Sequence, residues 1–422
     1  MSLRGVALGL ACVVGIVTAP GVSAHELTEL VGPYASERDA GPLAFRGGAE
    51  LRWQRRTLAI LREYGCIAHE AGSACPDGSR LGLARDLAAT RTTTALDIDL
   101  RLAFYRALEV RLKLPFVIAD ETRLGFDAGV DEKSSLSAPY NAPALFEVPT
   151  VSERAGLGDP VVGLWVALTA HARDPEDPDL LAGVDVTFPL APARSPGSDA
   201  VGSGAWGIAL ALAGSARALP WLEPFFRLDV AFAVPAGDEG LYADLGARQA
   251  TRGPPERVGA RFGIELVPYE HDRSAVRLEL GGELALLTAG KSATELFDAL
   301  GTSPCSADPT CELTRQAVGT RASGATIEEE HLATTLWFAA RWDIAQSLRL
   351  ATRATLGWET PHFLTASNLG VDVDGGGVDD VNRLGNNEHD PDYNVHLDAP
   401  GTRLRASEVM VVGLELSLLG RF

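Results

Sequence analysis

Charged side chains recur at every second position of several apolar stretches in this chain. Asp97, Asp99 and Arg101 alternate with aliphatic residues, and Arg111 and Lys113 do so after a short connection. Successive side chains of a β-strand point to opposite faces, so each stretch has one charged and one apolar face. Charges of both signs on one shared face could select solutes inside a passage.

The alternative is that these charges pair with one another and fill a closed interior. We keep both interpretations, and both require the charges to point into one enclosed space. The residues predicted to face this lumen are Asp97, Asp99, Arg101, Glu109, Arg111, Lys113, Arg227, Asp229, Glu265, Arg277, Glu279, Glu283, Arg341, Arg349, Arg353 and Glu415.

Catalytic chemistry is not expected from this sequence. A barrel phospholipase needs a Ser–His pair at its lipid-facing rim. The chain has no GxSxG motif, His331 falls on the inward-facing parity, and no serine is placed to partner His362. We therefore predict no enzyme, no cofactor and no metal site.

An acidic segment at 371–380 has oxygen ligands at alternate positions and several glycines, as calcium loops do. The twelfth position of such a loop needs a bidentate glutamate, and Arg383 stands there. Asp390, Asp392 and Asp398 follow. We expect a solvated acidic loop, with weak divalent binding as the alternative.

The N-terminal residues indicate export. Arg4 precedes an apolar run from 5 to 19 and a small-x-small site at 22–24, which is typical of a secretory signal peptide over residues 1–24. No later stretch approaches the roughly 20 apolar residues of a spanning helix. The exported protein is therefore either soluble or a β-barrel.

The net charge limits the partners that the protein is expected to bind, and the cysteines indicate which covalent bonds it forms. The formal net charge is −19, which argues against nucleic acid. After removal of the signal peptide four cysteines remain, in two close pairs. Because exported proteins fold in an oxidising compartment, we predict two local disulfides, Cys66–Cys75 and Cys305–Cys311.

Alternating stretches long enough to cross a bilayer are joined by connections that are short and long in turn. The short ones lie at 105–107, 171–179, 217–220, 269–273 and 344–346. The predicted strands cover 93–104, 108–118, 161–170, 180–190, 203–216, 221–234, 257–268, 274–287, 328–343, 347–359 and 410–422. Outer-membrane barrels have short periplasmic turns and long extracellular loops, so this alternation predicts such a barrel.

These eleven strands need a twelfth, because a periplasmic N-terminus requires an even number. Residues 49–61 are the candidate, although they could also form a short helix. The predicted fold is thus an all-β, antiparallel, twelve-stranded transmembrane barrel over 49–422, preceded by a periplasmic segment over 25–48. A soluble β-sandwich is the alternative, but it rarely needs so many strands of spanning length with one charged face.

The last predicted strand suggests how the barrel reaches its membrane. It has an apolar face and carries the aromatic Phe422. We expect the barrel-assembly machinery to recognise this residue, and we expect contacts with lipid and lipopolysaccharide in a Gram-negative outer membrane.

Glycine-based motifs in the middle of the chain suggest a relationship. They are Gly-Leu-Gly-Asp at 156–159 with Gly163, Leu-Ala-Gly-Val-Asp-Val-Thr-Phe-Pro at 181–189, and Val-Gly-Ser-Gly-Ala-Trp at 201–206. The segment 156–234 resembles outer-membrane proteins associated with the meta-cleavage pathway of phenol degradation. It departs from them at 189–192, where Pro-Leu-Ala-Pro replaces their Pro-Thr-Gly.

The resemblance implies an outer-membrane barrel that transports small hydrophobic or aromatic compounds, and it supplies no binding residues. Together with the charged inner face, it favours a channel for passive passage of a small solute. The alternative is a non-conducting surface barrel whose acidic loops bind ions or cell-surface partners.

Overall fold

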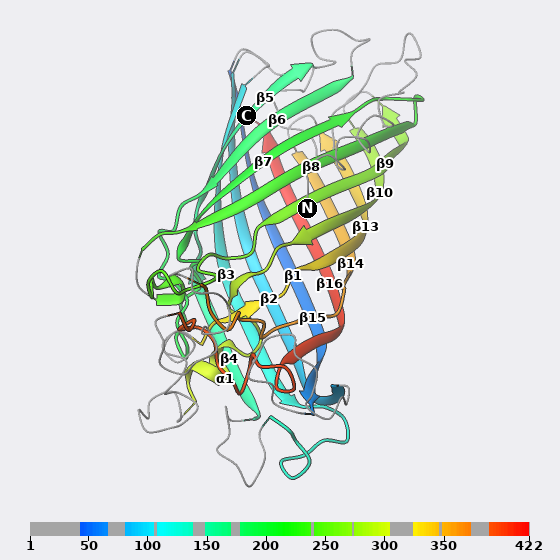
Figure 1. Ribbon diagram of the computed structural model, residues 1–422. Helices are drawn as coiled ribbons and strands as arrows, with labels where there is room; N and C mark the ends of the chain where they lie inside the picture. Colours follow the sequence, from blue (N-terminus) through cyan, green and yellow to red (C-terminus); the bar gives the residue numbers. More distant parts are fainter. Residues whose placement is uncertain are drawn as a thin grey trace, which may run out of the picture.

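The computed structural model describes residues 43–65, 81–104, 108–137, 148–169, 178–237, 240–271, 274–303, 324–345, 348–372 and 388–421. Twelve strands form one closed antiparallel barrel, because the first strand pairs with the last (Figure 1). They are β1 (Leu43–Tyr64), β2 (Gly82–Phe104), β3 (Leu108–Phe126), β5 (Val161–Thr169), β6 (Asp179–Thr187), β7 (Ala205–Ser215), β8 (Leu222–Pro235), β9 (Arg257–His271), β10 (Ser274–Leu287), β13 (His331–Ala345), β14 (Leu348–Glu359) and β16 (Leu404–Arg421).

The predicted fold and strand number are confirmed, and the uncertain stretch at 49–61 is a strand within β1. Four neighbouring strands, β16, β1, β2 and β3, extend further outward than predicted. In these extensions the inner face carries buried apolar residues, including Leu87 and Leu124, and in β1 the same change begins at Leu58 and Ile60, within the predicted stretch. The pattern of an apolar outer face and a charged inner face therefore ends before the strands do.

The predicted long loop at 119–156 also contains regular structure. β4 (Thr150–Leu157) pairs with the outer part of β3, and β5 pairs with β3 only between Leu108 and Lys113. At the junction the Gly158 N–H donates a hydrogen bond to the Pro115 carbonyl at 2.8 Å. Two successive strands thus form the wall beside β3.

The outer face of the barrel is apolar. In β5, Leu164, Val166 and Leu168 are exposed, whereas Trp165 and Ala167 between them are buried. In a soluble protein this arrangement would expose large apolar side chains around the whole wall. It is the arrangement of an outer-membrane barrel, whose lipid-facing band is apolar and whose interior is polar.

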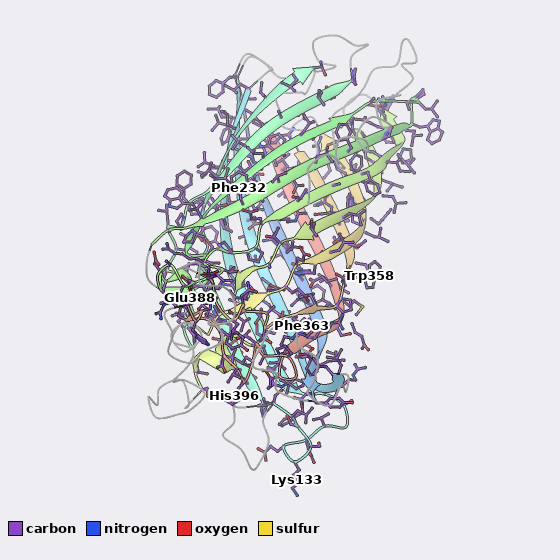
Figure 2. The ribbon with its side chains drawn as sticks, viewed as in Figure 1. Lys133, Phe232, Trp358, Phe363, Glu388 and His396 are labelled. Atoms are coloured by element: carbon purple, nitrogen blue, oxygen red, sulfur yellow. The ribbon has the colours of Figure 1, made fainter. Side chains whose placement is uncertain are left out.

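Aromatic side chains stand on this outer face near both ends of the strands. Trp221, Tyr269 and Trp342 are exposed near the short turns, and Trp206 and Trp358 are exposed near the long connections (Figure 2 labels Trp358). Such aromatic residues mark the two membrane interfaces. No helix in the described part of the chain is long and apolar enough to span a membrane.

Short elements from the long connections gather at one end of the barrel, and we call this the mouth. They are β11 (Gly290–Ser292), α1 (Phe297–Gly301), β12 (Thr326–Glu328) and β15 (His362–Phe363). In Figure 1, α1, β4 and β15 lie at the lower end. Leu296, Leu300, Leu364 and Leu397 from the mouth pack against the buried apolar residues of the long strands. The mouth therefore has a hydrophobic core of its own.

Candidate functional site: the barrel interior

The predicted lumen-facing residues occupy one region of the molecule. None of the sixteen is exposed: nine are buried and seven are half-buried. The buried ones are Asp97, Arg101, Glu109, Asp229, Glu265, Arg277, Glu279, Arg341 and Arg349. Their strand neighbours on either side project outward, so the alternation places these charges away from the lipid-facing side.

Ten of the sixteen meet around one cavity. It has a volume of about 200 Å³. The ten predicted lining residues are Asp99, Arg101, Arg111, Lys113, Glu265, Arg277, Glu279, Arg341, Arg353 and Glu415. Glu50 of β1 also lines it, and the sequence analysis missed this residue because the faces of 49–61 were not assigned.

Glu265 is the centre of a buried ion-pair network beside the cavity. It is 0% exposed, and its two oxygens lie 3.4 Å from Arg277 Nη1 and 3.2 Å from Arg341 Nη2. Arg341 also lies 3.5 Å from a Glu279 oxygen. Buried charges of this kind are tolerated only when they are paired, so these four side chains position one another.

Further pairs cross between adjacent strands. Lys113 Nζ lies 2.7 Å from an Asp97 oxygen as an ion pair, and Arg353 Nη1 donates to Glu415 at 2.8 Å. Arg111 of β3 is paired with Asp185 of β6 across the intervening strand β5. Asp185 has the inward parity of β6, so the period-two pattern could have identified it.

A second group of pairs lies between β8, β9 and β10. Arg257 bridges Asp229 and Glu283, and Arg261 lies 2.9 Å from Glu283. Arg257 and Arg261 were not predicted as site residues. Both share the parity of Glu265 in β9, so the same pattern would have found them.

Two tryptophans also face inward, which the sequence analysis did not predict. The Trp165 ring lies between the guanidinium groups of Arg111 and Arg227, each 5.1 Å from its centroid. Its Nε1–H donates to Asp185 at 3.1 Å. Guanidinium groups stacked on an aromatic face are attracted by the ring quadrupole.

The second inward tryptophan is Trp337, whose Nε1–H donates to Glu279 at 2.6 Å. Glycines on adjacent strands make room for both rings. A Cβ atom at Gly183 or Gly281 would come within 2.2 Å of the Trp165 or Trp337 ring, respectively. An inward tryptophan is thus indicated by a glycine directly opposite it on the neighbouring strand. This pairing can be recognised only when the register of the two strands is known.

Most of the cavity charge is compensated. Five acidic and six basic side chains line it, so the formal charge of the lining is +1. The −19 net charge of the chain is therefore carried outside this cavity. The arrangement offers a solute charges of both signs on facing strands.

The prediction of a solvated acidic loop agrees with the exposed Asp372 and is wrong for the three other aspartates that the structure describes. Asp390, Asp392 and Asp398 are buried in the mouth. Asp392 accepts hydrogen bonds from Lys291 Nζ at 2.8 Å and Gln249 Nε2 at 2.6 Å. Folding of the mouth over the barrel removes these carboxylates from water, which the sequence pattern does not reveal.

Several predictions lie outside the described residues. They are the signal peptide over 1–24, residues 25–42 of the periplasmic segment, both cysteine pairs, Cys66–Cys75 and Cys305–Cys311, the terminal Phe422, and residues 373–387, which include most of the acidic segment.

Comparisons with known proteins give distant similarities. No protein-family model matches the sequence, and no curated protein matches it. Among solved structures, an outer-membrane channel from Pseudomonas putida F1 is 11% identical, with a TM-score of 0.43 over 93% of this chain and 100% of that chain. The CymD monoaromatic hydrocarbon channel is 10% identical, with a TM-score of 0.31 over 89% of this chain and 88% of that chain. A Pseudomonas aeruginosa FadL homologue is 8% identical, with a TM-score of 0.31 over 91% of each chain.

Proposed function

We propose that this protein is an outer-membrane channel for the passive passage of a small solute, including hydrophobic or aromatic molecules. The observation that carries the proposal is the cavity of about 200 Å³ inside a closed barrel, lined by charges of both signs. Cavities on the order of 150 Å³ hold a benzene molecule, so a single small ring is the matching size.

The chemistry of the lining supports a solute with both polar and flat apolar parts. Ion pairs such as Arg353–Glu415 can exchange partners with a polar substituent. Arg111, which lines the cavity, offers the planar face of its guanidinium group to a ring. Phenol is therefore a suitable first probe, and its binding can be measured by titration calorimetry.

The proposal is tested first by the conductance of the refolded mature protein in a planar bilayer. Folding is checked beforehand by the difference in electrophoretic mobility between unheated and boiled samples. We expect discrete current steps whose ion preference shifts toward cations in Arg111→Ala, because Asp185 then loses its partner. Arg123→Ala is the matched control, since this exposed arginine pairs with Glu121 on its own strand and does not line the cavity. A folded barrel that passes no current and binds no phenol would overturn the channel.

The packed mouth favours a second candidate, a non-conducting surface barrel. Its hydrophobic core and the buried Lys291–Asp392 pair hold the external segments in place. Such a barrel predicts no conductance, no effect of Arg111→Ala, and loss of ion or cell-surface binding when residues 373–387 are removed. For a channel we expect conductance, a changed ion preference in Arg111→Ala, and no loss of function when residues 373–387 are removed.

We further propose that lipopolysaccharide contacts the external end, that the barrel-assembly machinery recognises Phe422, and that both cysteine pairs form disulfides. Purification with bound lipopolysaccharide, assembly of a Phe422→Ala variant, and mass spectrometry of the unreduced protein test these points in turn.

A further inference from the structure

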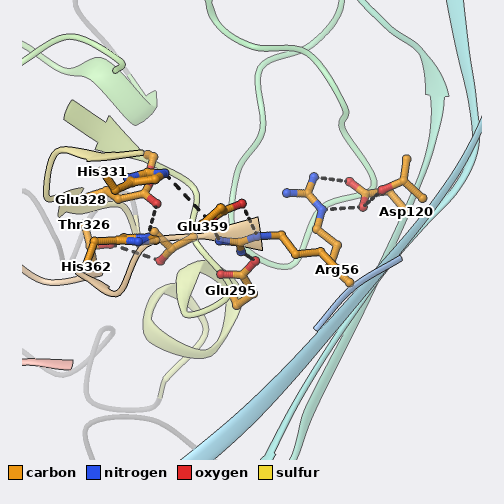
Figure 3. Close-up of polar contacts among 12 residues, drawn as sticks. Arg56, Asp120, Glu295, Thr326, Glu328, His331, Glu359 and His362 are labelled. Carbon is orange, nitrogen blue, oxygen red and sulfur yellow. Dashed lines mark hydrogen bonds and ion pairs between the residues drawn. The ribbon is translucent and has the colours of Figure 1, made fainter. Parts of the chain in front are cut away.

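Two histidines and a glutamate from three separate elements meet at the mouth (Figure 3). They are Glu328 at the end of β12, His331 at the start of β13 and His362 in β15. One ligand atom from each lies within 4.8 Å of the others. Hydrogen bonds between Glu329 and Phe363 in both directions, each 2.9 Å, join the two backbone segments that carry the histidines.

Both imidazole rings are oriented by backbone carbonyls. His331 Nδ1 lies 3.0 Å from the Glu329 carbonyl, and His362 Nδ1 lies 2.8 Å from the Thr360 carbonyl. Because a carbonyl oxygen only accepts, Nδ1 of each ring is the donor, and Nε2 is the nitrogen left to face the carboxylates. Metal-ligating histidines are oriented by the same type of second hydrogen bond.

The two Nε2 atoms are directed at carboxylates in a buried space. The His331 and His362 side chains are 4% and 0% exposed. His362 Nε2 lies 3.0 Å from Glu328 Oε1, and His331 Nε2 lies 3.8 Å from Glu359 Oε2. The second distance is longer than a hydrogen bond, which leaves room for a bridging ion.

The carboxylates are themselves held from outside the cluster. Ser292 Oγ donates to Glu328 Oε2 at 2.8 Å, and Arg56 donates to both oxygens of Glu359 at 3.2 and 2.7 Å. Arg56 also pairs with Glu295. The three carboxylates and one guanidinium carry a formal charge of −2, which suits a divalent cation.

We propose that Glu328, His331 and His362 bind a divalent transition metal, with Glu359 as a fourth ligand. Two imidazoles and carboxylates are a common set for Zn²⁺, whereas Ca²⁺ and Mg²⁺ prefer oxygen ligands alone. The rings now stack with a centroid distance of 3.8 Å and an interplanar angle of 11°. Coordination requires them to tilt, so that the two lone pairs converge on one ion.

A metal bound here would tie β12 and β15 to the ends of β13 and β14. It would thus stabilise the attachment of the mouth to the barrel wall, whether or not the barrel conducts ions. The competing explanation is a His362–Glu328 ion pair with a second imidazole stacked on it.

Zinc titration of the refolded mature protein tests the site. The protein carries no histidine tag, and its thiols are blocked with iodoacetamide so that cysteines cannot bind zinc. We expect one Zn²⁺ per barrel, with nitrogen and oxygen ligands at about 2.0–2.2 Å by X-ray absorption. His331→Gln and His362→Gln should each weaken binding at least about tenfold.

His271→Gln is the matched control, because this exposed histidine lies at the opposite end of the barrel and should leave zinc binding unchanged. Glu328→Gln preserves side-chain volume and serves if a histidine variant fails the electrophoretic test of folding. Zinc should also slow amide exchange at 326–332 and 360–364. Equal zinc binding by the wild type and a folded His331→Gln/His362→Gln variant would overturn the proposal, as would sulfur in the absorption spectrum.

Discussion

At the residue scale, inward aromatic rings are accommodated by glycines on neighbouring strands. Trp337 stands over Gly281 of β10 and hydrogen-bonds Glu279, which in turn pairs with Arg341. A side chain at the glycine would displace the ring and with it the hydrogen bond. The packing of one aromatic residue is thereby coupled to the buried ion pairs.

Gly281→Ala should lower the free energy of unfolding by about 1–3 kcal/mol, because its Cβ would overlap the Trp337 ring. Urea unfolding in lipid vesicles measures the change. Gly125→Ala is the control, since no atom lies within 4 Å of its added Cβ. If the clash is the cause, the loss in Gly281→Ala/Trp337→Ala will be smaller than the sum of the two single losses.

Glu265→Gln should destabilise the barrel by about 3–5 kcal/mol, because it leaves Arg277 and Arg341 without their shared buried carboxylate. The uncompensated positive charge should also shift ion preference toward anions. Glu121→Gln, which disturbs a more exposed pair with Arg123, should leave stability nearly unchanged. Equal effects of the two changes would show that the network does not depend on Glu265.

At the element scale, the mouth combines an apolar core with buried carboxylates. Asp398 accepts hydrogen bonds from the backbone N–H groups of Ser367 at 3.0 Å and Asn394 at 2.8 Å. Burial nevertheless raises the pKa of Asp398 to about 7, and the nearby charges of Asp390 and Asp392 act in the same direction. Arg62 and Tyr393 are the other titratable groups that interact with this carboxylate.

Because its pKa is raised, the Asp398 carboxyl keeps a proton while the mouth is folded. It releases this proton when the segment around Asp398 unfolds locally. The stability of the mouth should therefore be greatest below the ordinary pKa of about 4 and fall as the pH rises to about 7. Amide protection factors over 394–404, corrected for intrinsic exchange, should decrease by at most about tenfold per pH unit in this window. Asp398→Asn should weaken the trend and confine it to below about pH 6, because burial also raises the pKa of Asp390 to about 6. Protection that is independent of pH in the wild type would contradict it.

At the scale of the whole molecule, the bilayer decides which face each strand shows. Leu416 of β16 is 48% exposed, and it registers with Leu51 and Thr352 on the two neighbouring strands. Leu416→Arg should lower the free energy of unfolding by about 2–4 kcal/mol if this position lies near the bilayer centre. Leu190→Arg is the control, because Leu190 lies beyond the end of β6 and is 75% exposed. Similar small effects at both positions would argue against a lipid-facing Leu416.

Much of the barrel was predictable, because the alternation of side chains within a single strand is enough to identify its two faces. The alternation around Asp97–Lys113 and in β10 identified a charged and an apolar face, and the short connections gave the number of hairpins. The extensions of β1, β2, β3 and β16 were missed, because their inner face becomes apolar once the strands leave the membrane. The same parity would have found Arg257 and Arg261, whereas the inward Trp165 and Trp337 needed the alignment of neighbouring strands.

The sequence by itself determined an exported, twelve-stranded barrel with a charged interior, because period-two alternation and strand length respond directly to a bilayer. Only the tertiary structure decided which charges pair, since Glu265, Arg277 and Arg341 meet across strands whose register no local pattern specifies. It also decided that Asp390, Asp392 and Asp398 are buried and that His331 meets His362, 31 positions away. Contacts between distant segments depend on how the mouth folds onto the wall, and that is a property of the closed barrel.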